Sequence, residues 1–435
     1  MPRSSGRSLR RLGRGWGGVL ALGAALAATA AGQGPSAAAG YQVDLEQAIQ
    51  LALAHSPTLA AAQTQIPQSQ AQEVTAAIRP NPVLSWDALF LPIFQPGNLT
   101  ASYLNNTAEY DASVGYTIER GHKRQARVQA AKDATAVVRA QVKDSARGLS
   151  FNVAQQFIGA LLAKSSLEFA QQDLASWQST AGISQAQYNA GAISEGDLDT
   201  IQLQTLQFQA TVSADRLGLA QALVALRQQI GFEGIPAQYG VAGDLAFAPV
   251  HGNLQDLQAL ALRQRPDLMA AQAGVTAAES QHKLAQADGK RDLTVTGEYT
   301  HVGGLNTAGS LFSIEIPIFD RNQGEIARTA AAATQAQDQS KAAGEQVLSD
   351  VATAFAAVQQ GAQIVGLYTS GYREQAKQAL DIRQYSYTRG ASSLLDLLDA
   401  ERTYRSTELG YRQALATYML AVEQLKEAVG TRTLP

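Results

Sequence analysis

Four segments of the chain, each about ten residues long, alternate apolar with polar side chains, a period of two that no helix would show. They form two predicted β-hairpins, about residues 82–119 and about residues 292–318, with outward-facing loops at 91–108 and 302–309. One face is apolar with aromatic residues near its ends, and the other is hydroxylic or acidic. This pattern is typical of a tilted membrane-spanning strand with lipid on one side and water on the other. A soluble β-sandwich of the same strands is the alternative. The alternating apolar residues are Leu84, Trp86, Ala88 and Phe90; Tyr110, Ala112, Val114, Tyr116 and Ile118; Leu293, Val295 and Tyr299; and Phe312, Ile314, Ile316 and Ile318.

Two long stretches, residues 97–235 and 318–434, have no proline, and a proline inside a helix costs about 3 kcal/mol. Both are rich in Ala, Gln and Leu, which are good helix formers. They predict long helices at 121–188 and 324–387, each roughly 100 Å long at about 1.5 Å per residue. Helices of this length indicate coiled-coil or tubular packing, although a soluble helical bundle would explain the helices equally well.

The pattern occurs twice, with about 200 residues between matching positions, which indicates an internal duplication. Each half is expected to contain helix, β-hairpin, long helix, turn and helix. The matches are Pro57 and Leu59 with Pro266 and Leu268, Tyr188 and Gly191 with Tyr387 and Gly390, and Asp197 with Asp396. The first predicted repeat, 41–247, has helices 44–78, 121–188 and 194–230 and an equatorial segment 231–247; the second, 248–435, has helices 253–288, 324–387 and 393–430.

Residues 1–40 differ in composition from the rest and predict a signal peptide and leader. Several arginines are followed by a short stretch of small and apolar residues, and Ala28-Thr29-Ala30 offers an A-x-A cleavage site. We expect the mature chain to begin between Ala31 and Tyr41. A membrane anchor is the alternative, but the apolar stretch is short for a spanning helix.

Composition excludes several classes of function. The net charge of −3 and pI of about 6.0 give no electrostatic footprint for nucleic acid. With no cysteine, the chain has no disulfide, no thiolate metal site and no lipid-modified N-terminal cysteine. The five histidines are scattered, and neither a phosphate-binding loop nor a nucleophile elbow occurs. We therefore expect no enzyme activity, no cofactor and no resident metal, and the energy for any transport must come from a partner.

Four strands cannot close a barrel, since the smallest membrane barrels have about eight and an open edge cannot face lipid. The sequence therefore predicts an oligomer, and we expect a homotrimer. Three copies would form a twelve-stranded barrel and a helical tube around one axis, a fold that is mainly α with a membrane β-barrel.

The paired turns resemble those of the outer-membrane factors typified by TolC, and the resemblance covers the whole expected mature chain. Its most specific parts are Tyr188-x-x-Gly191 to Asp197 and Tyr387-x-x-Gly390 to Asp396-Leu397-Leu398-Asp399-Ala400. The resemblance implies a TolC-like trimer in the outer membrane of a Gram-negative bacterium, with outer-membrane lipid around the barrel and the tube in the periplasm. It also implies a periplasmic adaptor and an inner-membrane pump, expected to be of the RND type, as partners.

In that family the two turns form the periplasmic tip, where the duct narrows and meets the adaptor. The resemblance makes Asp396 and Asp399 the pore constriction and Tyr387 a gate residue. We expect Asp197 of the first turn to belong to the same constriction or gate. The family's gate arginine falls at Ser392 here, which leaves Arg389 as its nearest substitute. From the residues alone, the glycines suit helix ends and each Ser-x-x-Asp suits a helix start, so capping is the alternative role of Asp197. The adaptor-contacting residues of the turns are expected to be Gly191, Ser194, Gly390, Arg389, Ser392 and Ser393.

Residues 118–124 and 317–324 resemble the branch that serves cobalt, zinc and cadmium pumps. The function so implied is the passive exit duct of a tripartite efflux pump, for divalent heavy-metal cations or for drugs. A channel for type I protein secretion is one alternative. A soluble periplasmic coiled-coil adaptor or spacer is the alternative from another class.

Overall fold

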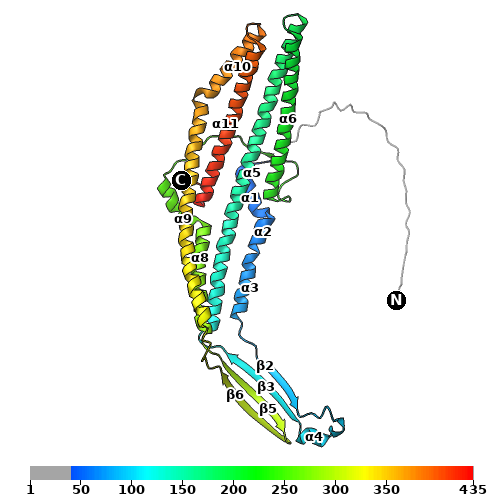
Figure 1. The fold of residues 1–435 in the computed structure, drawn as a ribbon, viewed down its shortest axis with the longest axis vertical. Coiled ribbons are helices and arrows are strands. Elements are labelled where there is room, and N and C mark those ends of the chain that lie inside the picture. Colours follow the sequence, from blue (N-terminus) through cyan, green and yellow to red (C-terminus); the bar gives the residue numbers. More distant parts are fainter. Residues whose placement is uncertain (1–40, 435) are drawn as a thin grey trace, which may run out of the picture. The chain divides into compact units, whose positions relative to one another are not determined.

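Long helices make up most of the chain, and a four-stranded sheet lies at one end of them (Figure 1). The computed structural model describes residues 41–434, and the expected signal peptide lies outside this part. None of the helices in residues 41–434 combines the length and hydropathy that crossing a bilayer requires. The first half contains β1 (Gln42–Val43), α1 (Leu45–His55), α2 (Pro57–Gln63), α3 (Gln65–Ala77), β2 (Val83–Leu89), η1 (Pro96–Asn98), α4 (Ala101–Asn106), β3 (Glu109–Ile118), α5 (Lys123–Asn189), α6 (Glu195–Ile230) and β4 (Gly240–Val241). The second half contains α7 (Leu254–Gln264), α8 (Pro266–Asp288), β5 (Leu293–Val302), β6 (Leu305–Ile314), α9 (Gln323–Leu367), η2 (Tyr368–Tyr372), α10 (Arg373–Thr388) and α11 (Leu394–Val429).

Only one of the two long helices is continuous. Helix α5 runs for 67 residues without a break. Its predicted counterpart, 324–387, is wrong as a single helix, because a five-residue π-helical segment, η2, separates α9 from α10. Gly371 in η2 has φ 120°, a conformation that an L side chain rarely adopts. Such π-bulges kink helices, and Figure 1 shows α10 turning away from the line of α9.

The two shorter predicted helices, 44–78 and 253–288, are also interrupted, at matching places. Ser56 precedes Pro57 with ψ 120°, and Arg265 precedes Pro266 with ψ 122°. The ring of a proline pushes the preceding residue out of the helical region, and proline itself then starts the next helix. The predicted 44–78 helix breaks again at Thr64, between α2 and α3.

The larger sheet is antiparallel throughout, in the order β2-β3-β5-β6. Strands from the two hairpins therefore pair through β3 and β5, and β2 and β6 form its edges. Residues directly opposite one another share a face, so the predicted alternation of polar and apolar positions is maintained across the strands. The polar face includes Asp87, Asp111, Ser113 and Glu298, and the apolar face includes Trp86, Ala112 and Tyr299.

Four details of the strands and loops differ from the prediction. Strand β6 begins at Leu305, directly after a Gly303-Gly304 turn, so the predicted loop 302–309 is too long. It ends at Ile314 rather than 318, consistent with Pro317, which has no N–H to donate. The loop 91–108 contains η1 and α4, and the equatorial segment contains β4, which pairs in parallel with β1.

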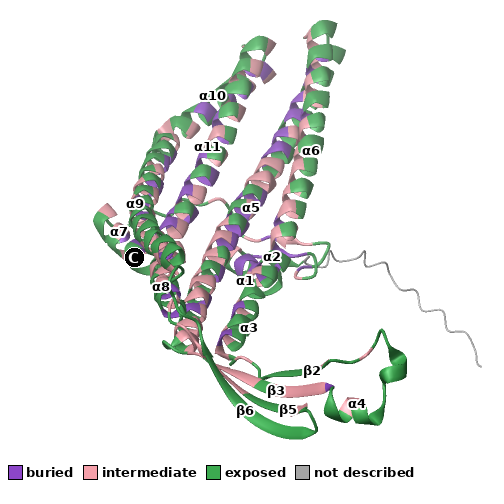
Figure 2. Cartoon of the chain, turned by 60° about the horizontal axis from the view of Figure 1, so that its bottom comes forward, coloured by how far each residue is buried: buried purple, intermediate pink, exposed green. Residues whose placement is uncertain are grey.

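The helices and the sheet differ in how far their residues are buried. Buried residues follow the inner faces of the helices, whereas β6 is exposed along its whole length (Figure 2). One apolar core lies among α1, α5 and α6, a second among α7, α9 and α11, and a third near the helix ends around Trp177, Phe208 and Leu397. In a single chain the sheet thus buries little, and its apolar face is left for other surroundings.

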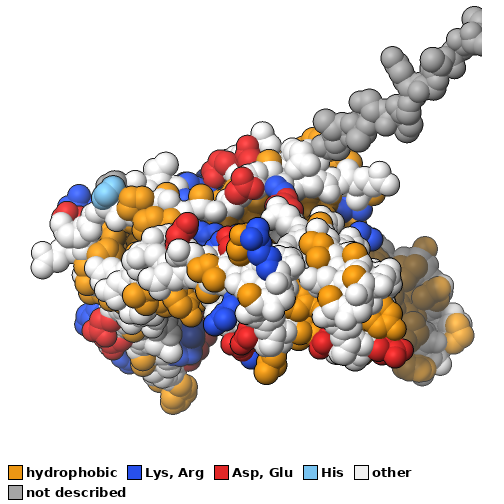
Figure 3. Space-filling view, turned by 90° about the horizontal axis from the view of Figure 1, so that it is seen from above, with side chains coloured by type: hydrophobic (Ala, Val, Ile, Leu, Met, Phe, Trp, Pro, Cys, Tyr) orange, Lys and Arg blue, Asp and Glu red, His pale blue; other side chains and the backbone are white. Residues whose placement is uncertain are grey.

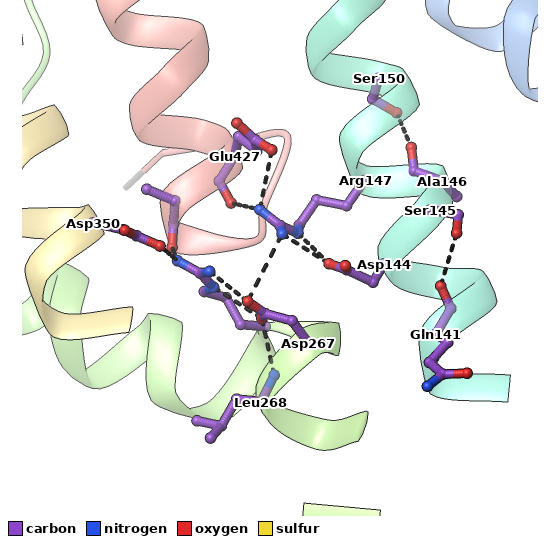
Figure 4. A network of polar contacts seen from close by, with 12 residues as sticks. Gln141, Asp144, Ser145, Ala146, Arg147, Ser150, Asp267, Leu268, Asp350 and Glu427 are labelled. Carbon is purple, nitrogen blue, oxygen red and sulfur yellow. Dashed lines mark hydrogen bonds and ion pairs between the residues drawn. The ribbon is translucent and has the colours of Figure 1, made fainter. Parts of the chain in front are cut away.

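Ion pairs connect helices from the two halves. Arg147 of α5 lies among acidic side chains that include residues of α8 and α11 (Figure 4). Arg265, buried before α8, binds acidic residues of α8 and α9 and the Ala428 carbonyl of α11. A buried guanidinium needs such partners, so this network fixes where the helices meet. The distances are 2.8 Å from Arg147 to Asp144, 3.9 Å to Asp267 and 3.3 Å to Glu427, and 2.5 Å from Arg265 to Asp267 and 2.8 Å to Asp350.

Candidate functional site

Two turns of matching geometry connect α5 to α6 and α10 to α11, at the end of the helices away from the sheet (Figure 1). Gly191 and Gly390 adopt φ 72° and 70°, which permits a left-handed helix end. The N–H of the residue after each glycine returns to a carbonyl of the last helical turn. These hydrogen bonds run from Ala192 to Gln187 at 2.8 Å and from Ala391 to Ser386 at 2.9 Å. The duplication predicted from sequence thus extends to the hydrogen bonds of the turns.

Serine begins the helix after each turn. The hydroxyl of Ser194 accepts from the Asp197 N–H at 3.1 Å, and that of Ser393 accepts from the Asp396 N–H at 3.2 Å. In the second turn the Asp396 carboxylate also accepts from the Ser393 N–H at 3.2 Å, which completes a capping box. Asp197 accepts from the Ser194 hydroxyl at 2.8 Å, so both aspartates take part in capping.

The two turns border one open hollow of about 790 Å³. It brings together residues that are about 200 positions apart, and its wall includes most of the residues predicted for the tip. Asp396 and Asp399 are not part of that wall. The predicted residues that line it are Gly191, Ser194, Asp197, Tyr387, Arg389, Gly390, Ser392 and Ser393.

Polar side chains connect the helix pair α5–α6 to the pair α10–α11 in the wall of the hollow and one helical turn away from it. The hydroxyl of Tyr387, whose side chain is buried, lies 3.3 Å from the Ser184 hydroxyl. Gln187 donates to the Thr388 carbonyl at 3.1 Å. One turn lower, Gln384 donates to the hydroxyl of Thr180 at 3.2 Å. The sequence identified Tyr387 but not its partners, although Thr180 and Ser184 lie on the same helical face as the buried Trp177 and Asp173.

Asp396 and Asp399 have different environments. Hydrogen bonds from the Ser393 hydroxyl and N–H hold the pKa of Asp396 below its ordinary value. Asp399 is paired with Arg402, one turn further along the helix. Because α11 begins at Leu394, Asp396 lies in its first turn and Asp399 in its second. Both side chains remain solvent-exposed in the single chain.

Arg389, the predicted substitute for the gate arginine, stacks on the ring of Tyr385 with 4.3 Å between the guanidinium carbon and the ring centroid. Within residues 41–434 it forms no ion pair. Ser392, at the position of that arginine, donates to Asp396 at 3.3 Å. The second turn is thus held by hydrogen bonds rather than by a salt bridge.

Charges at this end of the molecule are dispersed. Figure 3 views the chain from the end that carries the turns, and acidic and basic side chains lie there in small separate groups. No group of three or more potential metal ligands occurs among the described residues.

The chain is similar to known outer-membrane proteins. The sequence model of the family described as outer membrane efflux protein matches residues 48–232 and 257–431. The pyoverdine export outer membrane protein OpmQ of Pseudomonas putida is 27% identical over 424 residues, which cover 89% of this chain and 86% of that protein. The cobalt-zinc-cadmium resistance protein CzcC of Cupriavidus metallidurans is 26% identical over 401 residues, which cover 89% of this chain and 90% of that protein. Among solved structures, the outer membrane protein VceC from Vibrio cholerae matches with a TM-score of 0.71 and 20% identity, covering 89% of this chain and 96% of that chain.

The matches confirm the TolC-like fold, the place in the outer membrane and the predicted resemblance, and the alternative of a soluble coiled-coil spacer is wrong. Both halves of the duplicated chain fall within the matched segments. The chain belongs to the outer membrane efflux protein family.

Proposed function

We propose that three copies of this chain form one passive duct that releases divalent heavy-metal cations across the outer membrane. A periplasmic adaptor contacts the tip turns, and an inner-membrane pump of the RND type supplies the energy. The observation that carries the proposal is the pair of matching turns around one hollow, on a chain of the efflux family.

The open sheet supports a trimer. Edge strands β2 and β6 have no partner strand among the described residues, and a sheet edge cannot face lipid. Pairing of β2 with β6 of a neighbouring copy would satisfy both edges at once. Four strands from each of three copies then give a closed barrel, with the apolar face toward lipid.

The placement of acidic residues supports a cationic cargo. Asp87, Asp111 and Glu298 share the polar face of the sheet, which would line the lumen of the barrel. At the other end, a trimer with Asp396 and Asp399 directed inward would place a ring of carboxylates at the constriction. Such rings attract cations and repel anions.

The relatives favour two kinds of cargo. CzcC is a cobalt-zinc-cadmium resistance protein, whereas OpmQ is an outer membrane protein of pyoverdine export, and the two are similarly close to this chain. The acidic residues favour the metal cations. Export of an organic molecule such as a siderophore is the second candidate.

Deletion of the gene in its native host tests the cargo. The deletion strain is expected to become sensitive to zinc, cobalt and cadmium while its tolerance of drugs and its siderophore export stay unchanged. A plasmid copy of the gene should restore metal tolerance. Unchanged metal tolerance together with lost siderophore export or drug tolerance would refute the proposed cargo.

A further inference from the structure

Two buried carboxyl groups lie where the helix pair α5–α6 packs against the pair α10–α11. We call this contact the seam. Asp173 of α5 and Glu401 of α11 are each only 7% exposed. Asp173 lies about 24 Å from the end of α5, at about 1.5 Å per residue, so the pair is well below the tip turns. Burying two carboxylates side by side is costly unless a proton or a cation compensates.

The compensation is incomplete. Asp173 and Glu401 lie close enough for each to act on the pKa of the other, and two carboxyl groups can hydrogen-bond to each other only when one of them carries a proton. Arg405 places its Nε 2.9 Å from Asp173 Oδ2, and its guanidinium carbon 4.5 Å from the ring centroid of Phe208 in α6. One guanidinium neutralises one carboxylate. With one proton the group of three side chains is neutral, and without it a negative charge is buried.

The surroundings offer little to stabilise that second charge. The contact between Arg405 and Asp173 is an ion pair without hydrogen-bond geometry, and Asp173 Oδ2, Glu401 Oε1 and Arg405 Nε have no hydrogen-bond partner in the part of the chain that the structure describes. Lys377 of α10 acts on Glu401 from further away and is itself paired with Asp381. The charged and titratable groups that face the pair or its arginine are Lys377 from α10, Tyr404 and Arg405 from α11, and Asp215 from α6.

We propose that Asp173 and Glu401 form a proton-dependent latch that holds α11 against α5 while they share one proton and loosens this seam when the proton is lost to solvent. The seam belongs to the passage only if the proposed duct is correct, but the latch itself is a property of one chain. Tyr387 and Ser184 hydrogen-bond across the same seam nearer the tip, so its loosening would reach the turns.

The direction of the pH dependence follows from the pKa values. Burial, together with the hydrogen bond and charge of Asp173, raises the pKa of Glu401 to about 8. Burial also raises the pKa of Asp173. A carboxyl whose pKa is raised by folding stabilises the folded state at acidic pH, and that contribution is lost as pH rises through the folded value. The latch is therefore closed below about pH 8 and weakened above it.

The absence of native cysteine allows two spin labels to report on the seam in the purified full-length protein in detergent. Labels at Gln172→Cys in α5 and Thr403→Cys in α11 occupy exposed positions beside the pair. The distance between labels is measured from about pH 6 to about pH 9. We expect a narrow distribution at the lower pH that broadens with a midpoint near pH 8.

Glu401→Gln removes the titrating carboxyl group but keeps an amide N–H that can donate a hydrogen bond to Asp173. The distribution of distances between the labels should therefore stay narrow over the whole pH range. Glu345→Gln, an exposed site on α9, should behave as the parent protein. If the Gln variant does not fold, Asp173→Asn should remove the pH response in the same way. A parent distribution that does not change with pH, or an equal change in Glu401→Gln, would overturn the latch without bearing on the cargo.

Discussion

Asp396 and Asp399 are separated by only three positions and have different roles in the single chain. Asp396 completes the capping box of α11, whereas Asp399 extends from the next turn beside Arg402. A carboxylate in the first turn of a helix is stabilised by its N–H groups and dipole. Capping and lining of a pore are compatible for Asp396, because its other carboxylate surface remains exposed.

Replacement of both residues by asparagine should weaken cation selectivity. In Asp396→Asn the new amide oxygen still accepts a hydrogen bond from the Ser393 N–H, so the helix start is preserved. One unit charge at about 4 Å in water is worth about 1 kcal/mol, so the ratio of cation to anion permeability in planar bilayers should fall by about fivefold or more. Glu345→Gln in α9 is the control for a charge lost elsewhere. An unchanged permeability ratio in the double variant would remove both aspartates from the pore.

Among the elements, η2 distinguishes the second long helix from the first. Gly371 has φ 120° there, and a Cβ added at this position would meet no atom within 4 Å. Gly344 in α9 also has open space around it but has no positive φ. The two glycines thus separate the effect of backbone conformation from that of packing.

Gly371→Ala should destabilise the protein by about 1–2 kcal/mol, because an L side chain is strained at positive φ. Gly344→Ala should instead stabilise it by up to about 1 kcal/mol, since alanine is the better helix former. The thermal midpoint of unfolding in detergent measures both. If both variants shift the midpoint in the same direction, the break in the helix at η2 is not a fixed feature of the fold.

The sequence predicts elements whose signals are local. Alternation marked the strands, proline-free stretches marked the long helices, and Gly with Ser-x-x-Asp marked the tip turns. The break at Gly371 had no such signal, because other glycines such as Gly344 lie in regular helix. Contacts between the halves, such as Gln187 with Thr388, depend on tertiary packing across about 200 residues. Burial of Asp173 and Glu401 contradicts the usual preference of carboxylates for water, so composition could not reveal it.

In the whole molecule, the sheet of one chain keeps two edges that are unpaired within residues 41–434. Strands β2 and β6 are edges, and large apolar side chains such as Trp86 and Phe312 are exposed on the sheet. Exposed apolar surface of this kind marks an interface with protein or membrane. The helices follow the same principle in the proposed trimer. Each chain supplies two helix pairs, and three chains together would complete the wall of the tube.

Whether three chains share one barrel can be decided from the mass of the purified mature protein in detergent. Native mass spectrometry should give a particle of three chains that requires detergent to stay in solution. A single chain that remains soluble without detergent would rule out the shared barrel.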